Sequence, residues 1–170
     1  MSVHKVKILD HKAIFAKLKR MAYQIYEANY LEKKIYLIGI DERGGFLATE
    51  LAAFLRALSP AEVILVTAQL DRSDAPGIGV SLSEPIRDLE NQHVVVVDDV
   101  LYSGTTMLHV VSILLQANPR TIQVAVMIDR GHRLMPVSPD FVGMVLATTI
   151  QQHVSFETDS ENSEVAVYLL

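Results

Sequence analysis

The chain has 170 residues, half of them hydrophobic and 21% charged, with a formal net charge of −5 at pH 7. This composition is typical of a globular chain that buries its own core; it argues against disorder, against broad nucleic-acid binding and, with no cysteine, against disulfide or thiolate chemistry. No apolar run reaches transmembrane length and no signal-peptide pattern is present, so we expect a cytoplasmic protein with no membrane partner. The length and the lack of a linker predict one domain over residues 1–170.

Hydrophobic periodicity and turn residues predict an alternation of helices and strands. In chain order we expect a helix over residues 10–30 with Asp10 as its N-cap, a strand over 35–40, a turn over 41–45, a helix over 46–58, a strand over 63–67, a mobile loop over 71–79, a short strand and turn within 80–91, a strand over 94–97, a helix over 105–116, a strand over 122–128, and strands near 154–156 and 165–167. This order predicts an α/β fold with a doubly wound, mostly parallel sheet and right-handed crossovers.

Residues 94–106 combine a strand, an acid pair and a loop of small residues. Four consecutive valines, Val94–Val97, predict a strand buried on both faces, and Asp98 and Asp99 follow where open α/β sheets bind ligands. The next loop opens a helix and therefore forms an anion site; it contains Tyr102, Ser103, Gly104, Thr105 and Thr106. Two acids alone are equally compatible with a solvated turn, but beside a phosphate cradle they suit the hydroxyls of a sugar phosphate.

A second loop has the same strand-to-helix setting. Its residues are Asp41, Glu42, Arg43, Gly44 and Gly45. The alternative is an ordinary turn in which the glycines only provide tightness. The position favours a second anion cradle, to which Arg43 adds a planar, permanently charged donor.

These motifs resemble a known family. Residues 94–106 resemble the 5-phosphoribosyl-1-pyrophosphate signature of type I phosphoribosyltransferases. Further along, Asp129-Arg130-Gly131-His132-Arg133, with Pro136, is similar to a motif of the bifunctional pyrimidine operon attenuator and uracil phosphoribosyltransferase family. That resemblance runs nearly the full length, from Ile8-Leu9-Asp10 to residues 165–168. It implies a type I phosphoribosyltransferase fold with a small hood.

The resemblance also implies how the phosphoribosyl donor is bound. Residues 102–106 would hold its 5′-phosphate, and the reacting centre would contain Asp98, Asp99 and Arg72. Pyrophosphate is expected at Asp41, Glu42, Arg43, Gly44 and Arg130. By the same resemblance, the Asp41-Glu42 bond is expected to be a strained cis peptide.

The base, metal and RNA sites are likewise implied by resemblance. Ile128 and Asp129 would border the base, with Asp129 a ligand of Mg²⁺ or water, while most Mg²⁺ ligands would come from the donor itself. RNA contacts in regulatory members correspond to Lys19, Arg20, His132 and Arg133. A homo-oligomer is expected on the same ground and from the high apolar fraction.

Two departures from the family pattern leave alternatives open. The loop over residues 71–77 keeps Arg72 but is shorter than in typical members and lacks their lysine cluster. Tyr23 and Ala28 stand where regulatory members carry polar or basic residues.

The leading hypothesis is a phosphoribosyltransferase acting on uracil or a related base. The alternatives are a nucleotide-sensing regulator that binds leader RNA and a catalytically silent nucleotide-binding adaptor.

Overall fold

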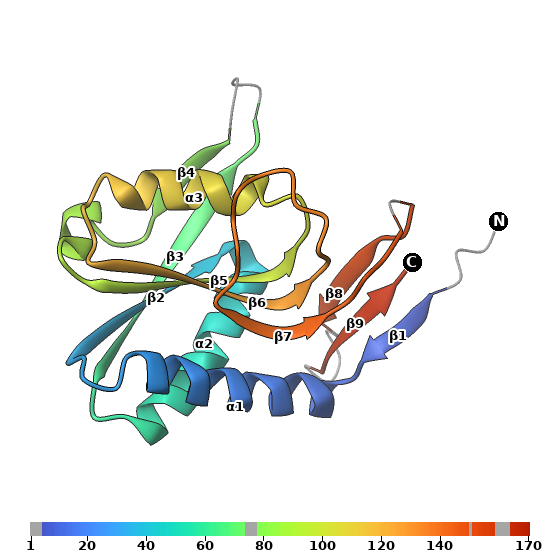
Figure 1. Cartoon of the computed structure of the whole chain (residues 1–170), viewed down its shortest axis with the longest axis horizontal. Helices are drawn as coiled ribbons and strands as arrows, with labels where there is room; N and C mark the ends of the chain where they lie inside the picture. Colours follow the sequence, from blue (N-terminus) through green and yellow to red (C-terminus); the bar gives the residue numbers. More distant parts are fainter. Residues whose placement is uncertain (1–4, 74–77, 150, 159–163) are drawn as a thin grey trace.

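The computed structural model describes residues 5–73, 78–149, 151–158 and 164–170, and a six-stranded sheet forms its centre (Figure 1). The strands run in the order β4-β3-β2-β5-β6-β7, and all are parallel except β4, which pairs antiparallel with β3. Their bounds are β2 Lys34–Ile40, β3 Glu62–Asp71, β4 Gly79–Leu82, β5 His93–Leu101, β6 Thr121–Asp129 and β7 Phe141–Val145. The predicted α/β fold with a mostly parallel sheet is confirmed.

Helices cover both faces of this sheet, as a doubly wound fold requires. Helices α1 (His11–Ala28) and α2 (Asp41–Leu58) lie on one face and α3 (Thr105–Leu115) on the other, while a 3₁₀ helix, Ile86–Leu89, precedes β5 (Figure 1). The Asp10 carboxylate caps α1 by accepting a hydrogen bond of 2.8 Å from the Ala13 amide, as predicted. Of the helices in the described part of the chain, none is both long and apolar enough to span a bilayer.

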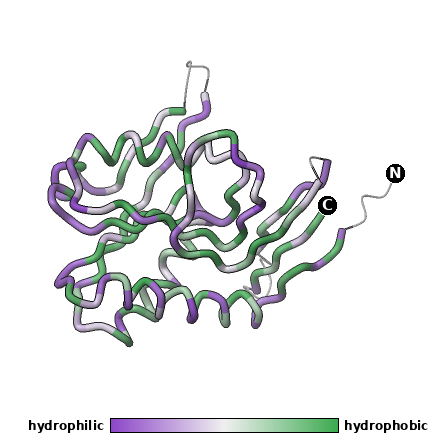
Figure 2. Tube along the Cα trace, viewed as in Figure 1, coloured by the Kyte–Doolittle hydropathy of each residue, from purple (hydrophilic) through white to green (hydrophobic). Residues whose placement is uncertain are grey.

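The four valines of β5 confirm the prediction of a strand buried on both faces. Val95 and Val97 belong to the core beneath α1 and α2, whereas Val94 and Val96 belong to the core beneath α3. All four are at most 1% exposed. Figure 2 shows the hydrophobic residues concentrated along the central strands, with hydrophilic residues in the connections.

A smaller antiparallel sheet lies beside the main one and forms the hood. It consists of β1 (Val6–Leu9), β9 (Val165–Leu169) and β8 (Val154–Thr158), in that order. Strands β8 and β9 were predicted, but β1 was not. Its four residues are too few to show a clear strand pattern, and the strand is held by pairing with β9 at the other end of the chain. The hood is joined to the main core through Phe156 and Val167, which are at most 1% exposed.

The largest correction concerns the predicted turn over residues 41–45, which is the first turn of α2. The glycines there serve close packing. A Cβ atom on Gly44 would lie 2.5 Å from the Val97 carbonyl oxygen, and one on Gly39 would lie 2.5 Å from the Gly45 Cα. The missing side chains therefore let the start of α2 rest directly on the backbones of β2 and β5.

Two strands also extend beyond their predicted ends. Strand β5 continues through Asp98 and Asp99, so the acid pair belongs to the strand rather than to the loop after it. Strand β3 continues to Asp71, which pairs with Gly79 of β4. The two ends of the predicted mobile loop therefore belong to strands, and residues 74–77 lie outside the described residues.

The close approach of α2 gives a stability prediction. Gly44→Ala should lower the free energy of unfolding by about 1–3 kcal/mol, because the new methyl group would overlap the Val97 carbonyl. Gly45→Ala is the matched control: nothing lies within 4 Å of its added Cβ, so it should raise stability by up to about 1 kcal/mol through helix propensity. Urea unfolding of the two variants measures both. Equal stability would refute the packing role of Gly44.

Candidate functional site

The main cleft lies where the winding of the sheet changes direction. From β2 the chain proceeds to β3 on one side, whereas β5, β6 and β7 proceed on the other. The connections that follow β2 and β5 therefore diverge from this point, which is where open α/β sheets bind ligands. The cleft has a volume of about 370 Å³ and is lined by Ile40, Asp41, Glu42, Arg43, Arg72, Asp98, Asp99, Val100 and Thr106. Several expected donor-binding residues thus share one cavity.

The acid pair forms one wall of this cleft. Asp98 Oδ1 accepts a hydrogen bond of 2.8 Å from the Asp99 amide, and Asp99 Oδ1 accepts one of 2.7 Å from the Val100 amide. Asp99 Oδ2 lies 3.4 Å from Nη1 of Arg43, across the cleft. Burial, and then the charge of Asp99, raise the pKa of the Asp98 carboxyl well above its usual range. Asp98 therefore ionises less readily than an ordinary aspartate, while Asp99 has a cation beside it.

The predicted phosphate loop continues from the acid pair into α3. Gly104 has φ +83° and ψ −2°, the left-handed conformation that glycine adopts without strain, and α3 begins at the next residue. The Ser103 hydroxyl lies 3.0 Å from that of Thr105 and accepts from its amide at 3.3 Å. A second hollow of about 190 Å³ lies here, and Asp98, Val100 and Thr106 line both cavities. An anion at this helix start would therefore lie next to the acid pair.

The start of α2, directly after β2, differs from the expectation at its first residue. The peptide between Asp41 and Glu42 is trans, since the described residues contain no cis peptide. Instead Asp41 has φ +49°, a left-handed conformation that is uncommon for residues other than glycine but tolerated by Asp. The bend comes from this dihedral angle, which turns the chain from β2 into α2 without a cis bond.

The Asp41 side chain is bound by donors at the end of β3. Its Oδ1 accepts hydrogen bonds from the Leu70 amide at 2.9 Å and from the Gln69 side chain at 3.1 Å. Its Oδ2 forms an ion pair of 3.0 Å with Arg72. Gln69 and Leu70 were missed by the sequence analysis. The pairing of Ile40 with Ala68 explains their position, and this register cannot be read from either segment alone.

The motif after β6 does not line the cleft, although part of it was expected beside the pyrophosphate. The Arg130 guanidinium is buried and donates to the Thr148 hydroxyl at 2.8 Å and to the carbonyls of Thr149 and Gln152 at 3.2 and 2.7 Å. It also lies 4.2 Å from the centre of the Tyr102 ring. In this structure Arg130 therefore ties the loop to the segment that leads into the hood.

Asp129 is likewise engaged. Its carboxylate accepts a hydrogen bond of 2.9 Å from the Gly131 amide and forms an ion pair with Arg133. The same loop is bound to the phosphate loop, since the amides of Leu134 and Met135 donate to the Ser103 carbonyl at 2.9 and 3.0 Å. Both oxygens of Asp129 thus have protein partners, which argues against an additional role as a metal ligand.

The four residues expected to contact RNA come from two elements. Lys19 and Arg20 are exposed on α1, whereas His132 and Arg133 belong to the loop after β6. The Arg20 guanidinium donates to the carbonyls of Val142 and Gly143 at 3.0 and 2.7 Å and so anchors β7 to α1. Arg133 is also paired, and Nδ1 of His132 lies 3.0 Å from the Arg130 carbonyl oxygen, so three of the four residues have partners within the protein.

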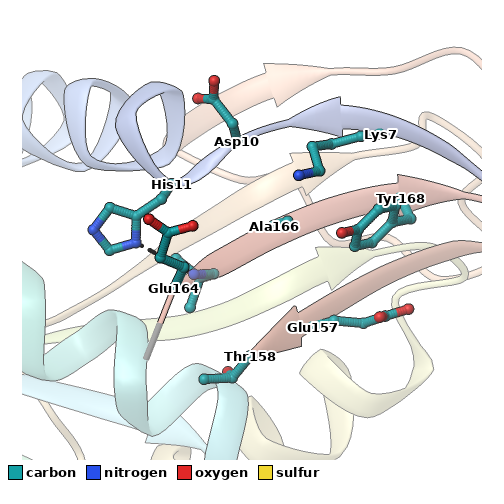
Figure 3. Close-up of a pocket in the computed structure, with 9 residues that line it drawn as sticks. Lys7, Asp10, His11, Glu157, Thr158, Glu164, Ala166 and Tyr168 are labelled. Atoms are coloured by element: carbon teal, nitrogen blue, oxygen red, sulfur yellow. Dashed lines mark hydrogen bonds between the residues drawn. The ribbon is translucent and has the colours of Figure 1, made fainter. Parts of the chain in front are cut away.

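A separate cavity of about 230 Å³ lies in the hood, where α1 meets β1, β8 and β9 (Figure 3). Its polar groups serve the fold. Asp10 caps α1, Glu157 pairs with Lys5 at 2.6 Å, and the His11 ring accepts from the Val165 amide at 3.2 Å. This cavity lacks the strand-end loops and the acid pair of the main cleft, which is therefore the better candidate site.

The described residues offer few side-chain ligands for a metal ion. In the part of the chain that the structure describes, no three His, Cys, Asp or Glu side chains are grouped so as to hold an ion. Asp98 and Asp99 are nevertheless oxygen ligands of the kind that Mg²⁺ prefers. A magnesium ion would fit here if the ligand bound in the cleft supplied most of the coordinating oxygens.

Comparisons with known proteins agree with this geometry. A family model described as a phosphoribosyl transferase domain matches residues 5–161. Two curated relatives are both named Bifunctional protein PyrR: that of Macrococcus caseolyticus is 34% identical over 95% of this chain and 97% of its own, and that of Geobacter sp. is 35% identical over 95% and 96%.

Solved structures share the fold at low sequence identity. A hypoxanthine phosphoribosyltransferase of Trypanosoma cruzi has a TM-score of 0.79 at 16% identity, covering 95% of this chain and 90% of that one. A hypoxanthine-guanine phosphoribosyltransferase of Bacillus anthracis has a TM-score of 0.70 at 17% identity and covers 84% of both chains. At these identities the likeness concerns the fold alone.

The raised pKa of Asp98 gives a pH prediction. The folded protein holds this proton more tightly than the unfolded chain, so stability falls as pH rises through the ordinary pKa of aspartate, about 3.9, toward the raised pKa of the folded state. Asp98→Asn cannot ionise and should melt at a higher temperature than the parent protein at pH 7.5, with the difference shrinking toward pH 4. Thermal unfolding across this range measures the effect; a difference that does not change with pH would contradict it.

Proposed function

Since the chain belongs to the phosphoribosyl transferase domain family, we propose that it transfers the phosphoribosyl group of 5-phosphoribosyl-1-pyrophosphate to uracil or a related base and releases pyrophosphate. The observation that carries this proposal is that the acid pair, the phosphate loop and the first turn of α2 line two adjoining cavities, which share Asp98, Val100 and Thr106. A sugar with a phosphate at one end and pyrophosphate at the other matches an acid pair flanked by two helix N-termini.

In the proposed reaction, a base nitrogen attacks the anomeric carbon of the ribose as the bond to pyrophosphate breaks. Backbone amides and hydroxyls of residues 103–106 would hold the 5′-phosphate. Asp98 and Asp99 would accept hydrogen bonds from the ribose hydroxyls and offset the positive charge that develops on the sugar. Arg43 and Arg72 line the same cleft and would stabilise the leaving pyrophosphate. Catalysis thus rests on positioning and electrostatics, with no covalent intermediate.

We propose Mg²⁺ as the cofactor, held chiefly by oxygens of the donor, because the described residues supply no cage of their own. When bound, the ion would offset the negative charge of the pyrophosphate. Asp98 and Asp99 are the side chains suited to approach it, whereas Asp129 is fully partnered. Ile128 and Asp129 at the end of β6 remain our proposal for one edge of the base site, with Asp129 held in place by Gly131 and Arg133.

A second function is favoured by the relatives, which are named bifunctional proteins and match along nearly the whole chain. In this proposal the protein also binds leader RNA through Lys19, Arg20, His132 and Arg133. Intramolecular bonds already hold Arg20 and Arg133, so RNA would have to contact them without breaking these bonds or compete with them. A salt-dependent gel shift with leader RNA tests this function separately from catalysis.

Three further statements belong to the proposal. Residues 1–170 act as one phosphoribosyltransferase unit, the protein works in the cytoplasm, and it forms a homo-oligomer. The last of these rests on the resemblance to the family and on the high apolar fraction of the chain.

The direct test is a panel of free bases incubated with the donor and Mg²⁺, with release of pyrophosphate as the signal. We expect release with uracil or a close relative. Asp99→Asn should reduce kcat/KM by about tenfold to a hundredfold, since losing a hydrogen bond to a charged acceptor costs about 1.5–3 kcal/mol. No release with any base, or full activity of the variant, would count against the assignment of the cleft.

A further inference from the structure

The first turn of α2 carries an acid where an anionic group of the donor is proposed to bind. Asp41 is the first residue of α2 and one of the residues that line the cleft. A carboxylate aimed at pyrophosphate would repel it. The structure instead turns the carboxylate toward β3, where three donors surround it: the Leu70 amide, the Gln69 side chain and the Arg72 guanidinium.

These bonds connect the two segments that flank the cleft on this side. Oδ1 is fixed by the backbone of β3 at 2.9 Å, which leaves Oδ2 to face Arg72 at 3.0 Å. The Arg72 side chain is 59% exposed, whereas that of Asp41 is only 27% exposed. An exposed arginine samples many rotamers unless a fixed partner restrains it, and Asp41 is such a partner because its own position is set by backbone bonds.

We propose that Asp41 is a positioning residue that holds the Arg72 guanidinium at the mouth of the cleft, ready for the pyrophosphate of the donor. The inference rests on the proposed function and deepens it. Asp41 does not touch the reacting atoms; it acts through Arg72, and its charge is balanced by that same side chain. Removing the carboxylate charge should therefore weaken the binding of ligands that carry pyrophosphate and leave the binding of ligands that lack it unchanged.

Asp41→Asn is the informative variant, because asparagine also tolerates the left-handed conformation and keeps an oxygen for the Leu70 amide. It loses the charge that restrains Arg72. Calorimetry with Mg²⁺ should show binding of 5-phosphoribosyl-1-pyrophosphate weakened roughly twofold to tenfold, the cost of ordering one long side chain. Binding of ribose 5-phosphate, which has no pyrophosphate, should be unchanged. Glu90→Gln controls for the loss of one negative charge, because Glu90 is exposed and lies before the start of β5, at the other end of the strands from the cleft.

A double-mutant cycle with Arg72→Ala shows whether Asp41 affects donor binding through Arg72. If Asp41 acts through Arg72, Asp41→Asn should have no further effect on donor binding in the Arg72→Ala protein. Equal weakening of both ligands would show a merely structural role and overturn the proposal. Tighter donor binding by Asp41→Asn would also overturn it, since the carboxylate would then act by repulsion.

The wild-type protein separates this inference from the proposed function. If it releases pyrophosphate with a base and the Asp41→Asn protein binds both ligands as the wild type does, only the role of Asp41 fails. If the wild type neither releases pyrophosphate nor binds the donor more tightly than ribose 5-phosphate, the proposed function fails and the inference with it.

Discussion

The first turn of α2 rests directly on the backbones of β2 and β5, and the shape of the cleft depends on this contact. Gly44 and Gly39 permit it, because a side chain at either position would overlap main-chain atoms. The contact sets the start of α2 beside the end of β5, so that Arg43 in the first turn of α2 faces Asp99. A helix displaced by the width of one methyl group would separate the two loops that are proposed to bind opposite ends of one ligand.

Charge balance is the second constraint on this cleft. Its lining contains four acids and two arginines: Asp41, Glu42, Asp98, Asp99, Arg43 and Arg72. Arg43 is paired with Asp99 across the cleft, and Arg72 is paired with Asp41 on one side of it. Burial and the charge of Asp99 raise the pKa of Asp98. A polyanionic donor would enter such a site most readily together with a divalent cation. The proposed need for Mg²⁺ therefore follows from the charges of the cleft as well as from the family.

Local sequence patterns predicted the parts of the fold that local physics determines. Four valines in a row specify a doubly buried strand, and Asp10 before a helical pattern specifies an N-cap. The sequence predicts a turn over residues 41–45, because nothing nearby in the sequence shows that β5 will pass against Gly44. Strand β1 was missed for a similar reason, since its partner β9 lies at the far end of the chain.

The candidate site also has parts that the local sequence predicts and parts that depend on tertiary packing. The acid pair and the phosphate loop are contiguous in sequence, and the structure places them along two adjoining cavities that share Asp98, Val100 and Thr106. The partners of Asp41 depend on the register of two parallel strands, and those of Arg130 depend on where the segment before the hood passes. Such contacts are set by tertiary packing, so a single sequence indicates the residues but not their bonds.

The measurement that tests the central claim most directly is a titration of ¹⁵N-labelled protein with ribose 5-phosphate, followed by amide chemical shifts. The account predicts the largest changes at residues 103–106 and at Asp98 and Asp99, with little change around the hood cavity near His11 and Tyr168. Changes concentrated at the hood cavity, or none at the loop before α3, would contradict the assignment of the sugar-phosphate site.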